Sequence, residues 1–311
     1  MKKILLMHRL RFEDQMERLE KQFEVITIRS SDDAQKIIDE NQDIVAIFSI
    51  VGRQITANII ESLPNLEIIS VYGVGYDHID LDKAKEREIV VTNTPNIVTR
   101  DTADTALALI LNISRRFVES DIYVRVGKWL AGNKPVGRAV WEKKVGILGL
   151  GRIGKAIALR AEAFDMDIAY TATKIKNDVP YVYYNDPVKL AENCDYLVVA
   201  CPGGEKTKHL VNKDVLKALG ENGYLINIAR GSVVNTEDLI WALENKIIAG
   251  AGLDVFENEP FVPEALLSMD NVVLLPHMGT ATEETLYLQG EMVLANLEAY
   301  FKGEKLPSQV I

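Results

Sequence analysis

Three short segments in the last third of the chain carry side chains that can bind an anion and move a proton. Arg230 lies in N-I-A-R-G, Glu259 in G-L-D-V-F-E-N-E-P, and His277 in P-H-M-G. Each segment follows an apolar run typical of a buried strand, and ligands of open α/β sheets bind beyond the carboxyl ends of strands. Taken singly, Arg230 could be a solvated surface arginine, Glu259 a loop carboxylate and His277 a structural histidine. Because three strand ends converge on one edge, we predict that they share a site.

A glycine-rich turn lies upstream of these segments. The sequence V-G-I-L-G-L-G-R-I-G joins a predicted buried strand to a helical pattern through G-x-G-x-x-G. Gly149 would permit the tight turn, Gly151 would let the backbone approach a pyrophosphate, and Gly154 would let the helix pack on the sheet. The free N–H groups at the helix start would attract the phosphates. The sequence therefore predicts a dinucleotide site here rather than a structural turn.

The composition excludes several classes of protein. The 311 residues are 48% apolar and 26% charged, as in ordinary globular proteins, and the length predicts about two domains. A net charge of −10 disfavours a nucleic-acid or anionic membrane partner. Two cysteines form no disulfide framework, and no Cys/His cluster has zinc-ligand spacing, so no metal is expected. The apolar stretch near the N-terminus is shorter than the ~7–15 residues of a signal peptide. We expect a cytoplasmic protein without a membrane segment.

Short β-branched runs alternate with amphipathic stretches of helical length, which is the pattern of parallel βαβ units. The first series of predicted strands covers residues 4–7, 25–28, 45–48, 68–71 and 89–92, and the second covers 145–148, 167–170, 196–201, 224–228, 250–255 and 272–275. The predicted helices cover 11–22, 33–41, 56–62, 153–164, 213–219 and 236–244, with a connecting helix at 99–118 and a closing helix at 283–301. The second series has the six strands of a dinucleotide-binding fold.

Together, the glycine loop, N-x-x-R-G, G-L-D-V-F-E-x-E-P and P-H-x-G-x-x-T resemble the D-isomer-specific 2-hydroxyacid dehydrogenase family. The resemblance runs end to end and includes V-T-N-T-P at 91–95 and G-V-G-Y-D-H-I-D at 73–80. Within the family the chain is most similar to the glyoxylate/hydroxypyruvate and hydroxyphenylpyruvate reductases, partly through V-P-Y at 179–181. The resemblance implies an oxidoreductase that reduces a small 2-oxoacid to the D-2-hydroxyacid with NAD(P)H.

The resemblance also implies a role for each matching residue. Arg230 would bind the substrate carboxylate and polarise the 2-carbonyl, which suits a planar fork. His277 would protonate the carbonyl oxygen as hydride arrives from the nicotinamide, and would act as base in the reverse reaction. Glu259 would orient the imidazole and raise its pKa. The backbone N–H groups of Val74 and Gly75 would complete the carboxylate site, which explains glycines there without a following helix.

The cofactor would contact residues at the ends of several strands. Asp254 would meet the nicotinamide amide rather than the substrate, and Thr207 would contact the phosphates. The implied cofactor set is Gly149, Leu150, Gly151, Arg152, Ile153, Gly154, Ala172, Thr173, Lys174, Cys201, Pro202, Thr207, Ile228, Ala229, Asp254 and Gly279.

The ribose end of this site lacks the acidic residue that selects NAD. Such an Asp or Glu usually ends the second strand, about 20 residues after the glycines. Here that strand ends in T-A-T-K, and Asp165 and Asp167 come before it or at its start. Thr173 and Lys174 align with part of the Ser-Arg-Ser of NADP-preferring relatives, although Lys174 could also be a solvated loop lysine. We expect NADP(H) to be favoured, with NAD(H) as an open alternative.

The resemblance further implies a discontinuous substrate domain. Residues 1–98 and 284–311 would form the substrate-binding domain, and residues 99–283 the NAD(P)-binding Rossmann domain. The fold class would be α/β, with two Rossmann-like or flavodoxin-like parallel-sheet domains. Relatives are typically homodimers paired through the cofactor domains. Segment 121–135, with Tyr123 and Trp129, is the candidate interface arm, although both aromatics could instead pack in a core.

Two departures from the family pattern concern the site. Gly203 and Gly204 stand where relatives usually have Leu-Thr-Pro, which predicts a more mobile loop. Arg53 stands where close relatives often have a smaller residue, so it could favour a second anionic group on the substrate or simply be solvated. Two other functions stay open: a dinucleotide-sensing co-repressor, which the complete catalytic trio disfavours, and a formate or phosphite dehydrogenase on the same fold.

Overall fold

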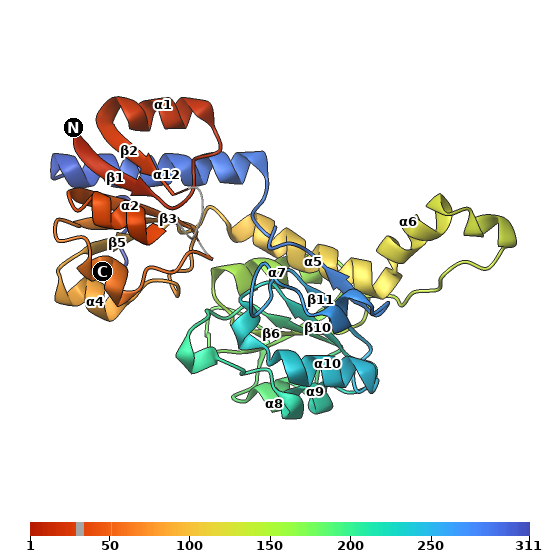
Figure 1. Cartoon of the computed structure of the whole chain (residues 1–311). Coiled ribbons are helices and arrows are strands. Elements are labelled where there is room, and N and C mark those ends of the chain that lie inside the picture. Colours follow the sequence, from red (N-terminus) through yellow and green to blue (C-terminus); the bar gives the residue numbers. More distant parts are fainter. Residues whose placement is uncertain (29–33, 51) are drawn as a thin grey trace. The chain divides into compact units, whose positions relative to one another are not determined.

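The structure is a computed structural model that describes residues 1–28, 34–50 and 52–311. The chain divides into two compact units (Figure 1). Unit 1 comprises Met1–Val98 and Ala281–Ile311, and unit 2 comprises Thr99–Thr280. Each unit has its own parallel sheet, so the predicted class of two parallel-sheet α/β domains is confirmed. The roles predicted for the two segments stay predictions.

The sheet of unit 1 has the order β2-β1-β3-β4-β5, which is the flavodoxin-like order. Alternate residues of each strand face opposite sides. Ile4 and Leu6 pack toward α1 and α12, whereas Leu5 joins the cluster under α2, α3 and α4. The strands are β1 (Lys2–Leu6), β2 (Phe23–Thr27), β3 (Ile44–Ile50), β4 (Ile68–Tyr72) and β5 (Val90–Thr92); the helices are α1 (Glu13–Gln22), α2 (Ala34–Glu40), α3 (Ala57–Glu61), α4 (Leu81–Glu86) and α12 (Glu283–Lys302).

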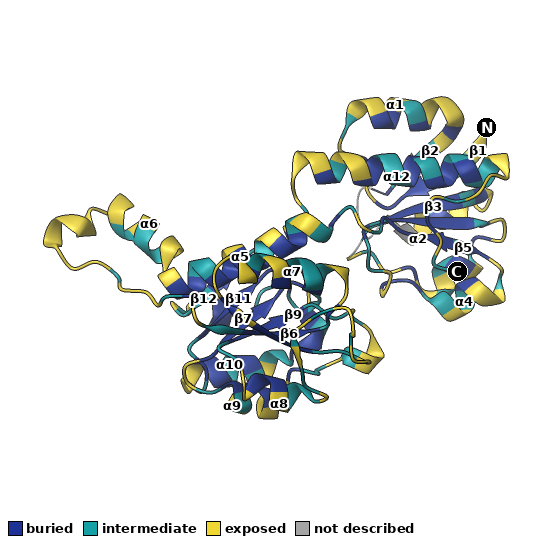
Figure 2. Cartoon of the chain, turned by 180° about the vertical axis from the view of Figure 1, so that it is seen from behind, coloured by how far each residue is buried: buried dark blue, intermediate teal, exposed yellow. Residues whose placement is uncertain are grey.

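The sheet of unit 2 has the order β12-β11-β10-β9-β6-β7-β8, which is the Rossmann order extended by β12. Its strands are β6 (Lys144–Leu148), β7 (Asp167–Thr171), β8 (Val182–Tyr183), β9 (Tyr196–Val199), β10 (Tyr224–Asn227), β11 (Gly250–Leu253) and β12 (Val272–Leu274). Helices α5 (Thr99–Arg115) and α7 (Arg152–Glu162) cover one face; α8 (Pro187–Ala191), α9 (Lys213–Leu219) and α10 (Thr236–Glu244) cover the other. The sheet between them is buried (Figure 2). A short helix, α11 (Glu264–Leu267), precedes β12.

Every predicted strand is present, with ends shifted by at most two residues. The prediction missed β8, because a two-residue edge strand has no alternation to detect. It also missed α4, α8 and α11, which are four to six residues long and too short for a helical period. The predicted helix 33–41 corresponds to α2, but its first residue lies outside the described ranges.

The predicted helix 99–118 is wrong beyond Arg115. Arg116 has a left-handed backbone (φ 55°), which ends α5, and α6 (Phe117–Arg125) begins at the next residue. Neither glycine nor proline marks this break in the sequence. Helix α6 and the 3₁₀ turn Lys128–Ala131 form an arm that leads away from the sheet of unit 2 (Figures 1 and 2). Trp129 in this arm is 64% exposed, so the alternative that it packs in a core is wrong.

Candidate active site

The glycine loop lies between β6 and α7, as predicted. Gly149 has φ +107°, and a Cβ there would lie 2.6 Å from the Cys201 nitrogen. A Cβ on Gly154 would lie 2.2 Å from the Gly149 oxygen, so the helix could not pack as closely with any other residue. A Cβ on Gly151 would meet nothing within 4 Å, and no side chain caps the N-terminus of α7. The loop therefore leaves open space before the N-terminus of α7, which fits a dinucleotide phosphate.

The carboxyl end of β7 has no acidic side chain. Thr173 and Lys174 follow this strand and are exposed. Asp165 lies before β7, and Asp167 is its first residue, so both carboxylates lie at the opposite end of the strand. This arrangement leaves a 2′-phosphate without a repelling carboxylate at the end where the ribose binds in Rossmann folds.

His277 and Glu259 are brought together in unit 2. His277 Nδ1 lies 2.6 Å from Glu259 Oε2, and the Phe256 N–H donates to Glu259 Oε1 at 3.0 Å. Burial alone would raise the pKa of Glu259, but the hydrogen bonds from His277 and Phe256 and the positive charge of Arg230 outweigh it and lower that pKa. Glu259 is therefore a carboxylate, and His277 Nδ1 is the donor of the shared bond.

Arg230 follows β10 and lies beside the loop that carries Glu259. A Cβ on the next residue, Gly231, would lie 1.9 Å from the Phe256 carbonyl carbon. Only glycine permits this close approach of the two segments. The Arg230 guanidinium donates to the Ala229 oxygen at 2.7 Å and also interacts with the charge of Glu259. The structure thus gathers the three predicted catalytic residues in one region of unit 2.

Asp254 has a structural connection that the sequence did not show. Its carboxylate accepts the Met278 N–H at 2.7 Å and the Gly279 N–H at 2.8 Å, and its carbonyl accepts the His277 N–H at 2.8 Å. His277 has a left-handed backbone (φ 52°), a conformation that surrounding bonds must maintain. Burial raises the pKa of Asp254, and the two backbone bonds offset that rise only in part. Asp254 therefore holds the segment that presents His277.

A second imidazole–carboxylate pair bonds to the same loop. His209 Nε2 lies 2.7 Å from Glu257 Oε1, and the Thr236 hydroxyl donates to Glu257 Oε2 at 2.7 Å. Burial would raise the pKa of Glu257, but these bonds outweigh it and lower that pKa. Glu257 appears in the quoted motif, yet neither motif nor spacing links it to His209, 48 residues away.

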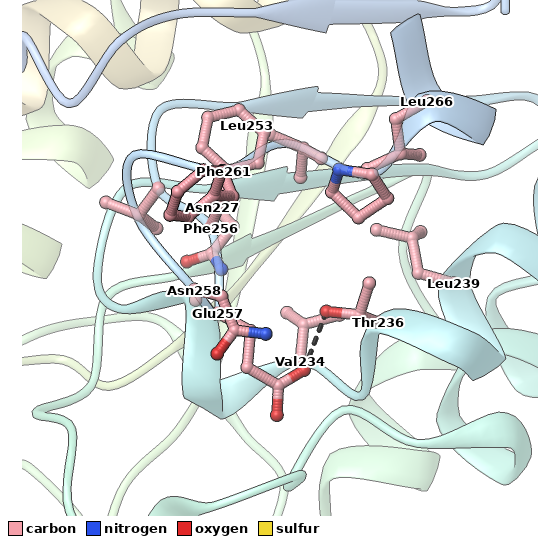
Figure 3. A pocket seen from close by; sticks show the side chains of 13 residues that line it. Asn227, Val234, Thr236, Leu239, Leu253, Phe256, Glu257, Asn258, Phe261 and Leu266 are labelled. Carbon is pink, nitrogen blue, oxygen red and sulfur yellow. Dashed lines mark hydrogen bonds between the residues drawn. The ribbon is translucent and has the colours of Figure 1, made fainter.

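A small cavity lies beneath this loop, and the Thr236–Glu257 bond borders it (Figure 3). Its volume is about 40 Å³, enough for an ordered water and too small for a substrate beside a dinucleotide. Leu253, Phe256 and Phe261 line its apolar side. The cavity is therefore part of the loop's packing and not a substrate pocket.

The loop after β9 has internal hydrogen bonds, and the predicted contact of Thr207 with the phosphates stays a prediction. The Thr207 hydroxyl donates to the Pro202 oxygen at 2.7 Å and so closes its own loop. Gly204 has φ +112°, which favours glycine at that position. Burial raises the pKa of Cys201 to about 11, so its thiol is neutral and packs rather than reacts. Among the other cofactor candidates, Ile228 and Ala229 directly follow β10, Ala172 directly follows β7, and Arg152 and Ile153 begin α7 just after Leu150 and Gly151.

The predicted substrate amides lie in unit 1. Val74 and Gly75 follow β4, and neither N–H has a hydrogen-bond partner among the described residues. Arg53 is partly exposed in the same unit, and its role stays a prediction. Within the described residues, no cluster of His, Cys, Asp and Glu side chains could hold a metal ion. No helix in the described ranges is long and apolar enough to cross a bilayer.

The chain is similar to characterised reductases over most of its length. It is 48% identical over 296 residues to glyoxylate/hydroxypyruvate reductase A of Arabidopsis thaliana, with 94% of each chain covered. It is 49% identical over 255 residues to hydroxyphenylpyruvate reductase of Plectranthus scutellarioides, with 82% of each chain covered. A structure of the NADPH-dependent glyoxylate/hydroxypyruvate reductase of Sinorhizobium meliloti with NADP and malonate has a TM-score of 0.94 and 41% identity, covering 99% of this chain and 96% of that one.

The family model described as D-isomer specific 2-hydroxyacid dehydrogenase, NAD binding domain, matches residues 107–279. The chain belongs to this family. The resemblance predicted from the motifs is therefore confirmed. This D-2-hydroxyacid dehydrogenase is an NAD(P)-dependent oxidoreductase that interconverts a 2-oxoacid and a D-2-hydroxyacid. The relatives described above are reductases, so the co-repressor alternative has no support.

Proposed function

We propose that this D-2-hydroxyacid dehydrogenase reduces small 2-oxoacids of the glyoxylate and hydroxypyruvate type, with Arg230, Glu259 and His277 as its catalytic residues. The observation that carries the proposal is the 2.6 Å bond between His277 Nδ1 and Glu259 Oε2, with Arg230 in the adjoining segment. The names of the relatives at 48% and 49% identity support this substrate class.

Each residue has a separate task in the proposed reaction. The Arg230 fork binds the substrate carboxylate and polarises the 2-carbonyl. His277 Nδ1 donates its hydrogen bond to Glu259. The other ring nitrogen, Nε2, therefore delivers the proton to the carbonyl oxygen of the substrate. Glu259 orients the ring and balances the charge of the imidazolium. A bound nicotinamide supplies the hydride.

We assign part of the substrate-carboxylate binding to unit 1 and the cofactor binding to unit 2. The N–H groups of Val74 and Gly75, without partners among the described residues, support a carboxylate site in unit 1. The open space at Gly151 and the uncapped α7 support a phosphate site in unit 2. Both cysteines are free thiols, which supports a reducing compartment such as the cytoplasm.

The substrate assignment is tested by initial rates with glyoxylate, hydroxypyruvate and 4-hydroxyphenylpyruvate, each with NADPH and with NADH. We expect turnover of the two smaller 2-oxoacids at micromolar to millimolar KM. Turnover of formate or phosphite in place of every 2-oxoacid would overturn the assignment.

We also propose that NADPH is preferred over NADH. Thr173 and Lys174 are exposed at the carboxyl end of β7, where no carboxylate opposes a 2′-phosphate. The Sinorhizobium meliloti relative, which is named NADPH-dependent, supports this preference.

The Lys174→Ala variant tests the cofactor preference. We expect kcat/KM for NADPH to fall about 3–10-fold, since one exposed ionic hydrogen bond contributes on the order of 1 kcal/mol. The value for NADH should not change, and Lys176→Ala serves as the matched control on the same loop. A parent enzyme that prefers NADH contradicts the proposal.

We propose further that two copies of the chain pair through the arm of unit 2. Helix α6 has no buried residue, although Phe117, Val118, Ile122 and Val124 are apolar and 46–53% exposed. Leu130 in the following turn is 96% exposed. An exposed apolar surface of this extent is typical of a protein–protein interface. The same arm of a second copy presents an identical apolar surface that could bury it.

Sedimentation velocity tests this pairing. The double variant Ile122→Glu/Trp129→Glu should sediment as a monomer at concentrations where the parent is a dimer. Leu159→Glu is the matched control, because Leu159 is 66% exposed on α7 and lies outside the arm. A parent that is monomeric at micromolar concentration overturns the proposal.

A further inference from the structure

Five polar side chains are buried together in unit 1, and none of them has a part in the chemistry proposed above. Their exposures lie between 0% and 9%. Burying polar groups costs free energy unless they are hydrogen-bonded, and a network of buried hydrogen bonds specifies one arrangement of its surroundings. Within the described residues, Gln289 Oε1 is the one buried side-chain oxygen of this group without a hydrogen-bond partner. The five residues, called the buried polar network below, are Asn93, Thr94, Gln289, Asn296 and Ser308.

The inner part of the network holds the loop at 73–75. The Gly73 N–H donates to Thr94 Oγ1 at 3.0 Å, and the Thr94 N–H donates to the Gly73 oxygen at 2.8 Å. Asn93 Nδ2 donates to the Val74 oxygen at 2.9 Å. Gly73 has φ +144°, so this turn depends on glycine and on the bonds that fix it. Three bonds thus determine where the peptide groups of the loop point.

The outer part of the network comes from segments about 200 residues further along the chain. Gln289 of α12 donates through Nε2 to Thr94 Oγ1 at 3.1 Å. The Ser308 hydroxyl donates to the Asn93 oxygen. Asn296, also on α12, holds Ser308 through bonds of 3.3 Å to its Oγ and 3.1 Å from its N–H. Each inner residue therefore has its own outer support.

Two further bonds connect the same elements. The Val310 N–H donates to the Val91 oxygen at 2.7 Å, which extends the sheet edge beyond β5. The Tyr72 hydroxyl, at the end of β4, donates to the Leu286 oxygen at 2.6 Å. Burial raises the pKa of Tyr72 to about 12, so the hydroxyl stays a donor. Both sides of the loop are thereby connected to segments late in the sequence.

We propose that α12 and segment 307–311 are a positioning element for the substrate, which acts through the buried polar network on the N–H groups of Val74 and Gly75. The proposal rests on the proposed function, in which these N–H groups bind the substrate carboxylate. Hydrogen bonds depend steeply on direction, so a tilted peptide group binds an anion less well. The network should therefore set the KM for the 2-oxoacid and leave the hydride and proton transfers to unit 2.

The variants Ser308→Ala and Gln289→Leu remove the two outer supports separately. We expect the KM for the 2-oxoacid to rise about 3–10-fold in each, since each loses one or two neutral hydrogen bonds. The kcat at saturating 2-oxoacid should stay within about twofold, and the KM for NADPH should not change. Hydrogen–deuterium exchange of the peptide 72–78 should become faster, whether or not substrate is present.

Ser70→Ala is the matched control. Ser70 lies on β4 and is 0% exposed. Its hydroxyl accepts a 3.0 Å bond from the Thr92 hydroxyl, and none of the hydrogen bonds that hold the loop at 73–75 involves it. This variant should lower the melting temperature without changing the KM or the exchange of 72–78. An equal KM rise in Ser70→Ala shows a general structural effect and overturns the positioning role.

The remaining outcomes separate this inference from the function on which it rests. A parent that turns over none of the 2-oxoacids overturns the proposed function, and this inference with it. A fully active parent whose Ser308→Ala and Gln289→Leu variants keep their KM and their slow exchange overturns only this inference.

Discussion

In unit 1 the loop at 73–75 is held by neutral side chains that are at most 9% exposed, whereas in unit 2 the side chains of His277 and Glu259 are 33% and 26% exposed. The first arrangement positions backbone N–H groups through side chains that do not ionise near neutral pH. The second presents ionisable side chains that hold each other through one 2.6 Å bond.

The difference follows from the task proposed for each unit. A peptide N–H cannot change its charge, so its direction is the only property that surrounding residues can set, and rigid buried bonds set it best. A proton donor has to gain and lose a proton, and full burial would penalise its charged form by several kcal/mol. His277 is instead partly exposed and has one carboxylate partner. We therefore expect changes in the His277–Glu259 pair of unit 2 to act on kcat with a pH dependence, and changes in the buried polar network of unit 1 to act on KM without one.

The variant His277→Ala should have the largest effect. Positioned general acids contribute about 10²–10⁴-fold, so kcat should fall by that factor. NADPH binding, followed by the change in nicotinamide fluorescence, should be retained, because His277 is separate from the glycine loop. His8→Ala replaces an exposed histidine of unit 1 and is the control. Near-normal kcat in His277→Ala would show that His277 is not the proton donor, and the contrast drawn between the two units would then be wrong.

Glu259→Gln should have the next largest effect. It keeps the size of the side chain but removes the charge that accepts the His277 Nδ1 proton. Loss of an ionic hydrogen bond of ~1.5–3 kcal/mol corresponds to about 10–150-fold in kcat. The difference in kcat between parent and variant should be greatest near neutral pH and should disappear at low pH. Bonds from His277 and Phe256 lower the pKa of Glu259, so its contribution is present above the ordinary value of 4.5 and is lost as pH falls through the lowered pKa.

The pH profile therefore checks the assignment independently of the rate. The parent should lose kcat on the acid side below the ordinary carboxyl pKa of 4.5, and Glu259→Gln should lack that acid-side loss. Equal acid limbs in parent and variant would assign the titration to another group.

The regular part of this fold was predictable from the sequence, because its cause is local. The runs at 145–148 and 224–228 are apolar on both faces, as in the strands of a parallel sheet, and the need for glycine at Gly154 reflects close contacts with Gly149 and Ile147, which lie within ten residues. The catalytic trio was predictable for a related reason, since each member directly follows a strand end. The end of α5 was not predictable, because it results from the left-handed backbone of Arg116, and arginine does not indicate such a conformation.

The supports of the site were not predictable, because they join residues distant in sequence. Ser308 contacts Asn93 across 215 positions, and His209 contacts Glu257 across 48. Each is an ordinary polar residue that pattern reasoning assigns to the surface. Only the fold shows that Ser308 is buried. Only the fold shows, likewise, that both carboxylate oxygens of Asp254 accept N–H groups of the backbone that follows His277.

Glu257→Gln should have the smallest effect of the three and tests whether support in unit 2 is also ionic. The His209 and Thr236 bonds lower the pKa of Glu257, so its contribution to stability is present above the ordinary value of 4.5 and is lost as pH falls through the lowered pKa. Removing the charge should reduce kcat about 2–10-fold by loosening the loop that carries Glu259. The melting temperature should fall near pH 7 and should lose its decline on the acid side.

Thr236→Val is the matched control, because it deletes the 2.7 Å hydroxyl bond to Glu257 and leaves the carboxylate and its His209 partner in place. A charge-based support predicts a smaller loss of kcat in Thr236→Val than in Glu257→Gln, with the acid-side decline of the melting temperature retained. Equal losses in both variants, with identical pH profiles, would mean that this loop is held by neutral bonding geometry alone. Unit 2 would then support its ionisable pair in the same way that unit 1 supports its backbone loop, and the contrast between the two units would be confined to the reacting side chains themselves.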